Sequence, residues 1–528
     1  MEPGSRTGRR AIARIAGLTA AGLGGVVAYD LTQKKHAILR NFPVLGHFRY
    51  WVETVGPELR QYIVTSNDEE RPFSRDQRRW VYASAKGENN YFGFGTDNDI
   101  EQVTGYPIVK HRTFTGPGAT TSPHGSEGLP LPSAKVLGGP RGRRLAFRPA
   151  SVVNVSGMSF GALSANAIEA LNAGAQIAGC MQNTGEGSIA PAHRHGGDLV
   201  FQIGTAYFGC RDEQGRFDLG RLVDLVQSAP VRALEIKLSQ GAKPGLGGML
   251  PGAKVSRTIA EIRGIPEGVD CASPSRHTAF DDVDSMLDFV ETIADATGLP
   301  VGIKSAVGNM DFWDDLVEQM GDRNRGVDFV NVDGGEGGTG AAPMIFADSV
   351  AYPFRIAFTE VYKRFAAAGL TDDVTFIGAG KLGLTENALV AFSLGADMVN
   401  VGREAMLAVG CIQSQKCHTD HCPVGVATQN PRYTRGLDPT LKKQRLASYV
   451  LALRRDLLKV SEAVGVVHPG LITADDIDIL DGQRATVSLR ELYGYQPGWG
   501  ELGPALQKEL VDVMAALGED QSDGERRG

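Results

Sequence analysis

The sequence has little excess charge, few cysteines and no long hydrophobic run beyond its N-terminus. Its 528 residues include 54 Lys and Arg and 61 Asp and Glu, a net charge of −7. Such a mildly acidic chain offers no electrostatic case for nucleic acid as its main partner. Six cysteines are too few for a disulfide scaffold of this length. A hydrophobic share of 42% excludes a wholly disordered chain, so we expect a globular protein.

Glycine, by contrast, is abundant, at 67 of 528 residues against a usual share of about 7%. The glycines gather in short loops that follow apolar runs. Because glycine has no side chain, such loops let the backbone approach a ligand closely. The composition therefore indicates ligand-binding loops at the ends of strands.

Eight short apolar runs predict the fold class. They alternate with helix-like stretches, and this alternation indicates a parallel sheet buried on both faces. Eight such units fit an α/β fold of the (β/α)8 TIM barrel type, whose site lies at the C-terminal ends of the strands. A doubly wound sheet is the alternative, but no G-x-G-x-x-G opens the first unit. The predicted strands cover residues 152–155, 180–184, 200–204, 233–238, 301–305, 329–333, 375–378 and 398–402.

Changes in composition along the sequence also predict the boundaries between its segments. We expect an N-terminal basic and apolar segment over 1–30 and an accessory region over 31–147. The barrel with its cysteine segment follows over 148–432, then a helical extension over 433–517. The charged last residues, 518–528, predict a disordered tail.

The N-terminal segment carries four arginines before an apolar run over 15–29. This run is shorter than the roughly 20 residues of a spanning helix. Arg9 and Arg10 loosely resemble a twin-arginine leader, although no clear cleavage site follows. We favour a cytoplasmic body with membrane association through the N-terminus.

Three cysteines, Cys411, Cys417 and Cys422, fall within twelve residues of a cysteine-poor chain. A zinc site would add His418 or His421, but the paired C-x2–4-C spacing of structural zinc sites is absent. Unequal gaps and a proline directly after the last cysteine are typical of iron–sulfur ligation. Plain structural thiols are the third interpretation. The spacing favours an iron–sulfur cluster over both alternatives.

Three successive predicted strands end in glycine. Bare backbone amides at such ends can hold phosphate, as near the seventh and eighth strands of many barrels. An arginine follows the last of these glycines, so a cation would stand beside the phosphate. The predicted phosphate cradle comprises Gly334, Gly335, Gly380, Gly402 and Arg403.

Two lysines, Lys237 and Lys304, lie on strands that are otherwise apolar, and Lys243 follows in a loop. A buried ammonium needs an anionic partner. That partner is either a ligand or a carboxylate in a buried ion pair. Glu186, at the end of the second predicted strand, is a candidate to relay protons or to pair with one of these lysines.

Several long motifs resemble one family. The run VSGMSFGALS over 155–164 resembles the opening of the flavin domain of glutamate synthase. Segments 183–187, 235–248, 334–343 and 410–429 resemble the same domain in the same order. The resemblance covers roughly 148–432, and the region before it is similar to single-chain FMN-binding glutamate synthase-like proteins.

This resemblance implies FMN, a 3Fe-4S cluster on Cys411, Cys417 and Cys422, and the substrate 2-oxoglutarate. Lys304 would face the edge of the flavin and Gln240 would orient the substrate, while Glu186 would handle protons. The phosphate of FMN would be held by the predicted cradle. Met158, Ser159 and Phe160 would line the isoalloxazine, and Lys237, Lys243 and Arg263 would grip the substrate carboxylates.

The chain also departs from the family. It has no amidotransferase domain, and Glu2 stands where a catalytic N-terminal cysteine would be. We therefore expect an enzyme that reduces 2-iminoglutarate, formed from 2-oxoglutarate and ammonia, to L-glutamate. The ammonia would be free or come from a separate glutaminase subunit, and electrons from ferredoxin or an NADPH-oxidising subunit.

Two alternatives to this function stay open. Leu246 and Met249 stand where the family has polar residues, one of which contacts substrate. This favours, as one alternative, an FMN oxidoreductase or transferase acting on another small amino or oxo acid. The other is a partner-dependent electron-transfer subunit, since nothing in the chain makes ammonia.

Overall fold

The computed structural model describes residues 4–66, 69–91, 93–96, 98–100, 103–115, 130–483 and 485–527, with the side chains of 4–10, 57 and 519–527 left out. The chain divides into two compact units, Met1–Asp76 and Gln77–Gly528. The division falls inside the predicted accessory region, so the N-terminal unit extends well beyond residue 30.

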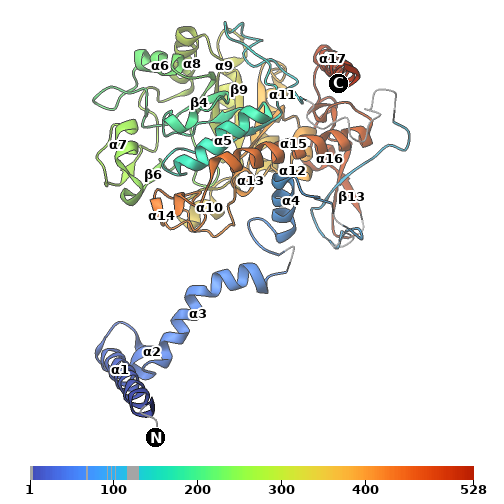
Figure 1. Cartoon of the computed structure of the whole chain (residues 1–528). Helices are drawn as coiled ribbons and strands as arrows, with labels where there is room; N and C mark the ends of the chain where they lie inside the picture. Colours follow the sequence, from blue (N-terminus) through green and yellow to red (C-terminus); the bar gives the residue numbers. More distant parts are fainter. Residues whose placement is uncertain are drawn as a thin grey trace. The chain divides into compact units, whose positions relative to one another are not determined.

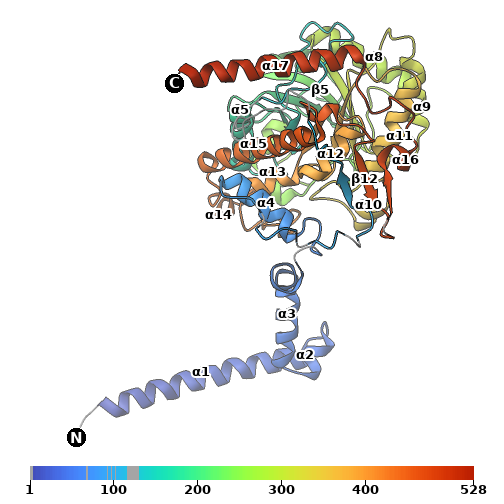
Figure 2. The same ribbon diagram turned by 90° about the vertical axis from the view of Figure 1, so that its right-hand side faces the viewer.

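The first unit is helical (Figures 1 and 2). It comprises α1 (Gly4–Thr32), α2 (Ala37–Asn41), α3 (Leu45–Leu59) and the π-helical turn η1 (Arg60–Val64). Within α1, Ala11–Thr32 is long and apolar enough to cross a membrane. The helix thus continues beyond the run over 15–29 that the sequence marked as too short to span.

A buried carboxylate shapes the turn that follows α1. Asp30 is fully buried and accepts hydrogen bonds from Val44 N (2.9 Å) and His47 Nε2 (2.9 Å). The bond from Val44 lowers the pKa of Asp30 below its ordinary value. It also holds Val44 at a φ of 65°, a conformation that costs a β-branched residue energy. Asp30 therefore fixes how the start of α3 folds back on the end of α1.

The second unit is built around a closed barrel of eight parallel strands (Figure 1). All eight predicted strands are present, and β11 pairs with β2 to close the barrel. The TIM barrel prediction is confirmed, with strand ends displaced by a few residues at most. In order around the barrel the strands are β2 (Val153–Val155), β3 (Gln182–Asn183), β4 (Leu199–Ile203), β5 (Val231–Lys237), β8 (Val301–Ser305), β9 (Phe329–Asp333), β10 (Thr375–Ala379) and β11 (Met398–Val401).

Helices surround the barrel, and their ends follow capping chemistry. Ser164 caps α5 by accepting from Ala167 N, and Gly179 ends the same helix in the left-handed conformation. Asp282 caps α8 through Ser285 N. The helices are α5 (Ala165–Ala178), α6 (Leu219–Gln227), α7 (Arg257–Arg263), α8 (Val283–Thr297), α9 (Asp311–Met320), α10 (Met344–Ser349), α11 (Phe354–Ala367), α12 (Thr385–Ser393) and α13 (Arg403–Ala408).

An apolar layer fills one part of the barrel interior. Phe329 from β9 lies so close to β8 that a Cβ at Gly302 would stand 2.3 Å from its ring. Leu137, from the segment before the barrel, joins this layer, and Phe147 packs against it. The other members are Met181, Val200, Ala233, Ile377 and Met398. The segment before β2 therefore supplies part of the barrel core.

The C-terminal extension is mixed rather than purely helical, which corrects the prediction. Its strands β12 (Ile477–Leu480) and β13 (Thr486–Ser488) form a sheet with β1 (Pro107–Val109) of the accessory region. Its helices are α14 (Pro431–Thr434), α15 (Pro439–Val464), α16 (Leu489–Tyr493) and α17 (Pro504–Arg527). Because α17 continues to Arg527, residues 518–527 are helical and not the predicted disordered tail (Figure 2).

Close helix packing fixes this extension on the barrel. α15 lies along α5, and a Cβ at Gly174 would stand 2.7 Å from Lys443 O. In the accessory region, α4 (Arg75–Lys86) places Trp80 edge-on against Tyr449 of α15. His468 joins the extension to the segment before the barrel through a hydrogen bond from Nε2 to Pro132 O (2.9 Å).

The buried imidazole of His468 predicts a pH dependence of stability. Burial lowers its pKa to about 4, against about 6.5 in an unfolded chain. Only the unfolded chain then gains this proton between those values, so stability falls as the pH falls through that window. From pH 7.5 to pH 5 we expect a loss on the order of 2 kcal/mol from this group.

The measurement is the urea-unfolding free energy of the purified protein at both pH values. His468→Asn keeps an acceptor for Gly470 N but cannot be protonated, so its loss between the two pH values should be smaller. His418→Asn, at an exposed position, is the matched control. Equal losses in wild type and His468→Asn would contradict the assignment.

Candidate active site

The C-terminal ends of four strands bring two ion pairs into the mouth of the barrel. Lys237, at the end of β5, lies 3.1 Å from Oε1 of Glu186, in the loop after β3. Lys304 of β8 lies 3.1 Å from Oδ2 of Asp333, the last residue of β9. Strands β5 and β8 pair with Lys237 beside Lys304. From the sequence, the anionic partner of each lysine could be either a bound ligand or a carboxylate of the chain. In the structure, both Lys237 and Lys304 form ion pairs with carboxylates of the chain.

Lys237 is also tied to the glycine loop after β9. Its ammonium donates to Oε1 of Gln240 (3.2 Å), whose Nε2 donates to Gly338 O (2.9 Å). Lys243 is buried in the same loop and donates to Gly247 O (3.2 Å). The predicted substrate residues Lys237, Gln240 and Lys243 therefore lie in one loop at the barrel mouth, with Glu186 against it.

Neighbouring charges determine the protonation states of Glu186 and Lys243. Burial alone would raise the pKa of the Glu186 carboxyl, but Lys237 and Lys243 lower it below its ordinary value. Burial and the charge of Lys237 in turn lower the pKa of Lys243. At neutral pH Glu186 is thus a carboxylate, stabilised by the positive charges of Lys237 and Lys243.

Lys304 carries the second pair. Burial alone would lower the pKa of its ammonium, but Asp333 and Glu235 raise it above its ordinary value. Asp333 also accepts from Gly241 N (3.1 Å), in the loop after β5. The sequence had not marked Asp333, although its place between a buried strand and a glycine run was a usable signal. It joins the loops after β5 and β9.

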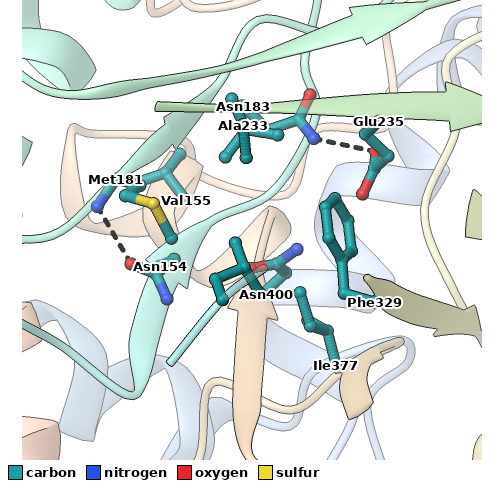
Figure 3. A pocket seen from close by; sticks show the side chains of 11 residues that line it. Asn154, Val155, Met181, Asn183, Ala233, Glu235, Phe329, Ile377 and Asn400 are labelled. Carbon is teal, nitrogen blue, oxygen red and sulfur yellow. Dashed lines mark hydrogen bonds between the residues drawn. The ribbon is translucent and has the colours of Figure 1, made fainter. Parts of the chain in front are cut away.

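A layer of amides surrounds the fully buried carboxylate of Glu235. Glu235 accepts from Asn183 (2.8 Å), the bond drawn in Figure 3, and from Gln202 (2.6 Å) and Asn331 (2.8 Å). Hydrogen bonds of this kind stabilise the charged form of a buried carboxylate. Asn183 and Gln202 also lie under the loop after β2, because a Cβ at Gly157 would stand 2.8 Å and 2.9 Å from them. Sequence patterns could not find this layer, since its members come from four strands.

The loop after β2 contains Met158, Ser159 and Phe160, the predicted flavin-facing residues. It packs on the loop after β3, because a Cβ at Gly185 would stand 2.5 Å from Ser159 N. Arg263 of α7 donates to Phe160 O (2.8 Å), and its guanidinium lies over the ring of Phe208. The structure thus places Arg263 against this loop, with the charge of Glu186 close enough to act on it.

The predicted phosphate glycines also converge. Gly380, at a φ of 121°, lies beside Gly334, whose N–H donates to Ala379 O (2.8 Å). Gly335 N donates to Tyr352 O (2.8 Å), so both amides of the first loop are engaged inside the protein. A Cβ at Gly402 would meet nothing nearer than 3.6 Å, which leaves space beside this glycine.

Arg403 follows Gly402 and closes one side of the cradle. Its guanidinium donates to Glu336 O, and its side chain packs on Gly338. Burial lowers the pKa of Arg403, while Glu404 and Glu336 oppose this. Strand ends β9, β10 and β11 therefore supply glycine backbone and one cation to the same region.

The three clustered cysteines lie in a loop with strained backbone. Gln413, Gln415 and Asp420 all adopt positive φ between 55° and 60°. Burial raises the pKa of Cys411 to about 12, and the thiols of Cys417 and Cys422 add to the effect. The three thiols are thus near enough to act on one another. Among the residues that the structure describes, no group of three His, Cys, Asp or Glu could hold a single metal ion.

His277, whose role the sequence left open, is hydrogen-bonded to the end of β5. Its Nε2 lies 2.9 Å from Lys237 O and its Nδ1 lies 3.1 Å from the hydroxyl of Tyr207. That hydroxyl accepts from Thr278 N and Ala279 N, so its proton goes to Nδ1 and the ring is neutral with a proton on Nε2. Burial lowers the pKa of His277. The ring therefore fixes the end of β5 and so the position of Lys237.

These observations define an α/β barrel whose mouth combines buried cations, carboxylates and glycine loops. Residues 144–467 match the family described as the conserved region in glutamate synthase. The chain belongs to the glutamate synthase family, whose members are oxidoreductases acting on CH–NH2 donors.

Several relatives are similar over most of the chain. The glutamate synthase large subunit-like protein YerD of Bacillus subtilis is 35% identical, over 83% of this chain and 89% of its own. A glutamate synthase large subunit-like protein of Rhizobium meliloti is 30% identical, over 68% and 83%. The archaeal glutamate synthase [NADPH] of Methanocaldococcus jannaschii is 33% identical over 60% of this chain, which spans 59% of that protein.

The solved structures that are similar to this chain are more distant in sequence. A mandelate oxidase variant with a monooxide FMN adduct has a TM-score of 0.40 and 15% identity, over 82% of this chain and 99% of the oxidase. A flavocytochrome b2 variant with pyruvate bound has a TM-score of 0.41 and 13% identity, over 83% and 94%. The fold assignment rests on the closed barrel of this chain itself.

The crossing of the loops after β5 and β9 yields a testable prediction. A Cβ at Gly241 would lie 1.9 Å from Gly334 O, a backbone atom that cannot move aside cheaply. Gly241→Ala should therefore separate the two loops, destabilise the protein by about 2 kcal/mol or more, and reduce the flavin retained per chain.

Thermal unfolding and the ratio of flavin to protein absorbance measure both effects. Gly308→Ala is the matched control, because the nearest atom to its added Cβ would be 3.8 Å away. A Gly241→Ala protein with wild-type stability and flavin content would show that the two loops do not need this contact.

Proposed function

We propose that this protein is a glutamate synthase-type flavoenzyme that reduces 2-iminoglutarate, formed from 2-oxoglutarate and ammonia, to L-glutamate. The observation that carries the proposal is the set of buried cations at the barrel mouth, Lys237, Lys243 and Lys304, beside the carboxylate of Glu186. A dicarboxylate substrate supplies the negative charge that such a set favours. Family membership supports the same reaction.

The residues present fit FMN as the cofactor. The backbone around Gly380 and Gly402 suits its phosphate, with Arg403 as the adjacent cation. Met158, Ser159 and Phe160 are proposed to line the isoalloxazine. Lys304, held cationic by Asp333 and Glu235, would stabilise negative charge on the reduced ring. Reduced FMN, when bound, would supply the hydride that reduces the imine carbon and would itself become oxidised.

The chain's own residues bind the substrate and move the proton. Lys237, Lys243 and Arg263 hold the two carboxylates, and Gln240 orients the molecule between them. Binding a dianion neutralises the cations that lower the pKa of Glu186. The pKa of Glu186 therefore rises when substrate arrives, so the carboxyl becomes a better proton donor toward the imine nitrogen.

A 3Fe-4S cluster bound by Cys411, Cys417 and Cys422 is the proposed entry point for electrons. A multi-iron cluster keeps its cysteine ligands further apart than a single ion does, which suits three thiols that interact without a single-ion site. The donor would be ferredoxin or an NADPH-oxidising subunit, and a separate glutaminase subunit would be one source of ammonia.

The test is an anaerobic half-reaction. The purified protein is reduced until its flavin absorbance bleaches, and 2-oxoglutarate is then added with ammonium. We expect flavin reoxidation that requires both reagents and forms one glutamate per flavin. Lys243→Met should slow this step at least tenfold at limiting 2-oxoglutarate, because it removes a buried carboxylate ligand.

Lys459→Met, at a lysine on α15 remote in sequence from these loops, is the matched control. Flavin that stays reduced with 2-oxoglutarate, but reoxidises with another small oxo acid and ammonium, would transfer the proposal to that acid. Such an outcome would fit Met249, which is about half exposed beside the site loop.

We also propose that the Met1–Asp76 unit attaches this protein to a membrane, with the barrel unit in the cytoplasm. α1 contains a span long enough to cross a bilayer, Ala11–Thr32, and basic residues flank this span: Arg9 and Arg10 precede it, and Lys34 and Lys35 follow it. α3 presents Leu45, Phe48 and Val52 to solvent at helical spacing. Trp51 of the same helix is also exposed, and tryptophan favours the bilayer interface.

Cell fractionation tests the attachment. The full chain should stay with membranes after alkaline carbonate extraction. The double variant Leu18→Arg and Leu23→Arg should be released, because each arginine costs about 2.5–3.5 kcal/mol at the bilayer centre. Leu441→Arg, at an exposed leucine of α15, should stay membrane-bound. A wild-type protein found in the soluble fraction would contradict the proposal.

A further inference from the structure

A second buried lysine group lies outside the substrate loops. Lys254 ends the short 3-10 turn η3 (Gly252–Lys254) and is 3% exposed. Its ammonium donates to Cys417 O (3.0 Å) and Ala162 O (3.1 Å). Among the described residues, no carboxylate oxygen lies within 4.0 Å of its Nζ. Lys254 thus differs from Lys237 and Lys304, which each have a carboxylate partner.

Two neutral carbonyls do not compensate a buried positive charge. Removing an ammonium from water costs several kcal/mol unless an anion lies near it. The hydrogen bond to Cys417 O places the ammonium beside the cysteine segment, which also carries Asp420 and Cys422. The neighbouring groups that could supply negative charge therefore belong to the cysteine segment.

The two carbonyls belong to different loops. Ala162 follows the proposed flavin-facing loop, and Cys417 is a proposed cluster ligand. Gln429 joins the same regions without charge, since its Nε2 donates to Gly161 O (3.1 Å) and Leu163 O (2.8 Å). Lys254 therefore forms a charged bridge, and Gln429 a neutral one, between the two proposed cofactor sites.

We propose that Lys254 is the fixed countercharge of the cysteine-bound centre and a positioning residue that holds this centre against the flavin-facing loop. The inference rests on the proposed function, because it takes Cys411, Cys417 and Cys422 as thiolate ligands. A one-electron reduction adds negative charge to the centre. A cation beside it stabilises the reduced form, so Lys254 raises the reduction potential of the centre.

The test compares Lys254→Met with Gln429→Met in the full-length holoprotein. Iron, sulfide and flavin are quantified, and the centre is titrated anaerobically under electron paramagnetic resonance. Lys254→Met should shift the reduction equilibrium toward the oxidised form at least tenfold, about 59 mV lower in midpoint potential. Gln429→Met should keep the wild-type potential, because it removes a bridge and no charge.

Each other outcome is decisive. A Lys254→Met protein with wild-type iron content and potential overturns the inference. If Lys254→Met loses its iron, Lys254→Arg decides: regained iron at a near-wild-type potential supports the countercharge, and continued loss in Lys254→Arg overturns it. Wild-type protein without iron and sulfide after anaerobic reconstitution overturns the cluster proposal itself, and this inference with it.

Discussion

The main constraint on this structure is the cost of keeping lysine ammonium groups inside a barrel. A buried cation requires an anion, and the chain provides carboxylates for Lys237 and Lys304 from the ends of other strands. Because the partners come from different loops, each pair fixes the distance between two strand ends. The barrel mouth therefore has its geometry set by charge before any ligand arrives.

Close backbone contact is the second constraint on the mouth. The loops after β5 and β9 cross where only glycine fits, and the loops after β2 and β3 do the same at Gly185. Side chains would separate these loops and open the site to water. The high glycine content thus serves loop-to-loop packing as much as close approach to a ligand.

The sequence predicted the barrel because most of its strands lie in short, mainly apolar runs, as burial on both faces demands. The pairing of Glu186 with a lysine was also foreseeable, since both lie at strand ends. Asp333 and the amides around Glu235 could not be found this way, because they meet only when β3, β4, β5, β8 and β9 come together in the closed barrel. The helical end at 518–527 was missed because charge-rich composition suits both a disordered tail and an exposed helix.

The pairing of β1 with β12 has a consequence for the order of events during synthesis. Residues 107–109 leave the ribosome long before their partners at 477–480, and β2 must likewise wait for β11. Neither the small sheet nor the barrel can close until most of the chain has been translated. Within the first unit, α2 contacts both α1 and α3, and Val44 N donates to Asp30. The N-terminal unit can therefore fold during synthesis while the barrel is still open.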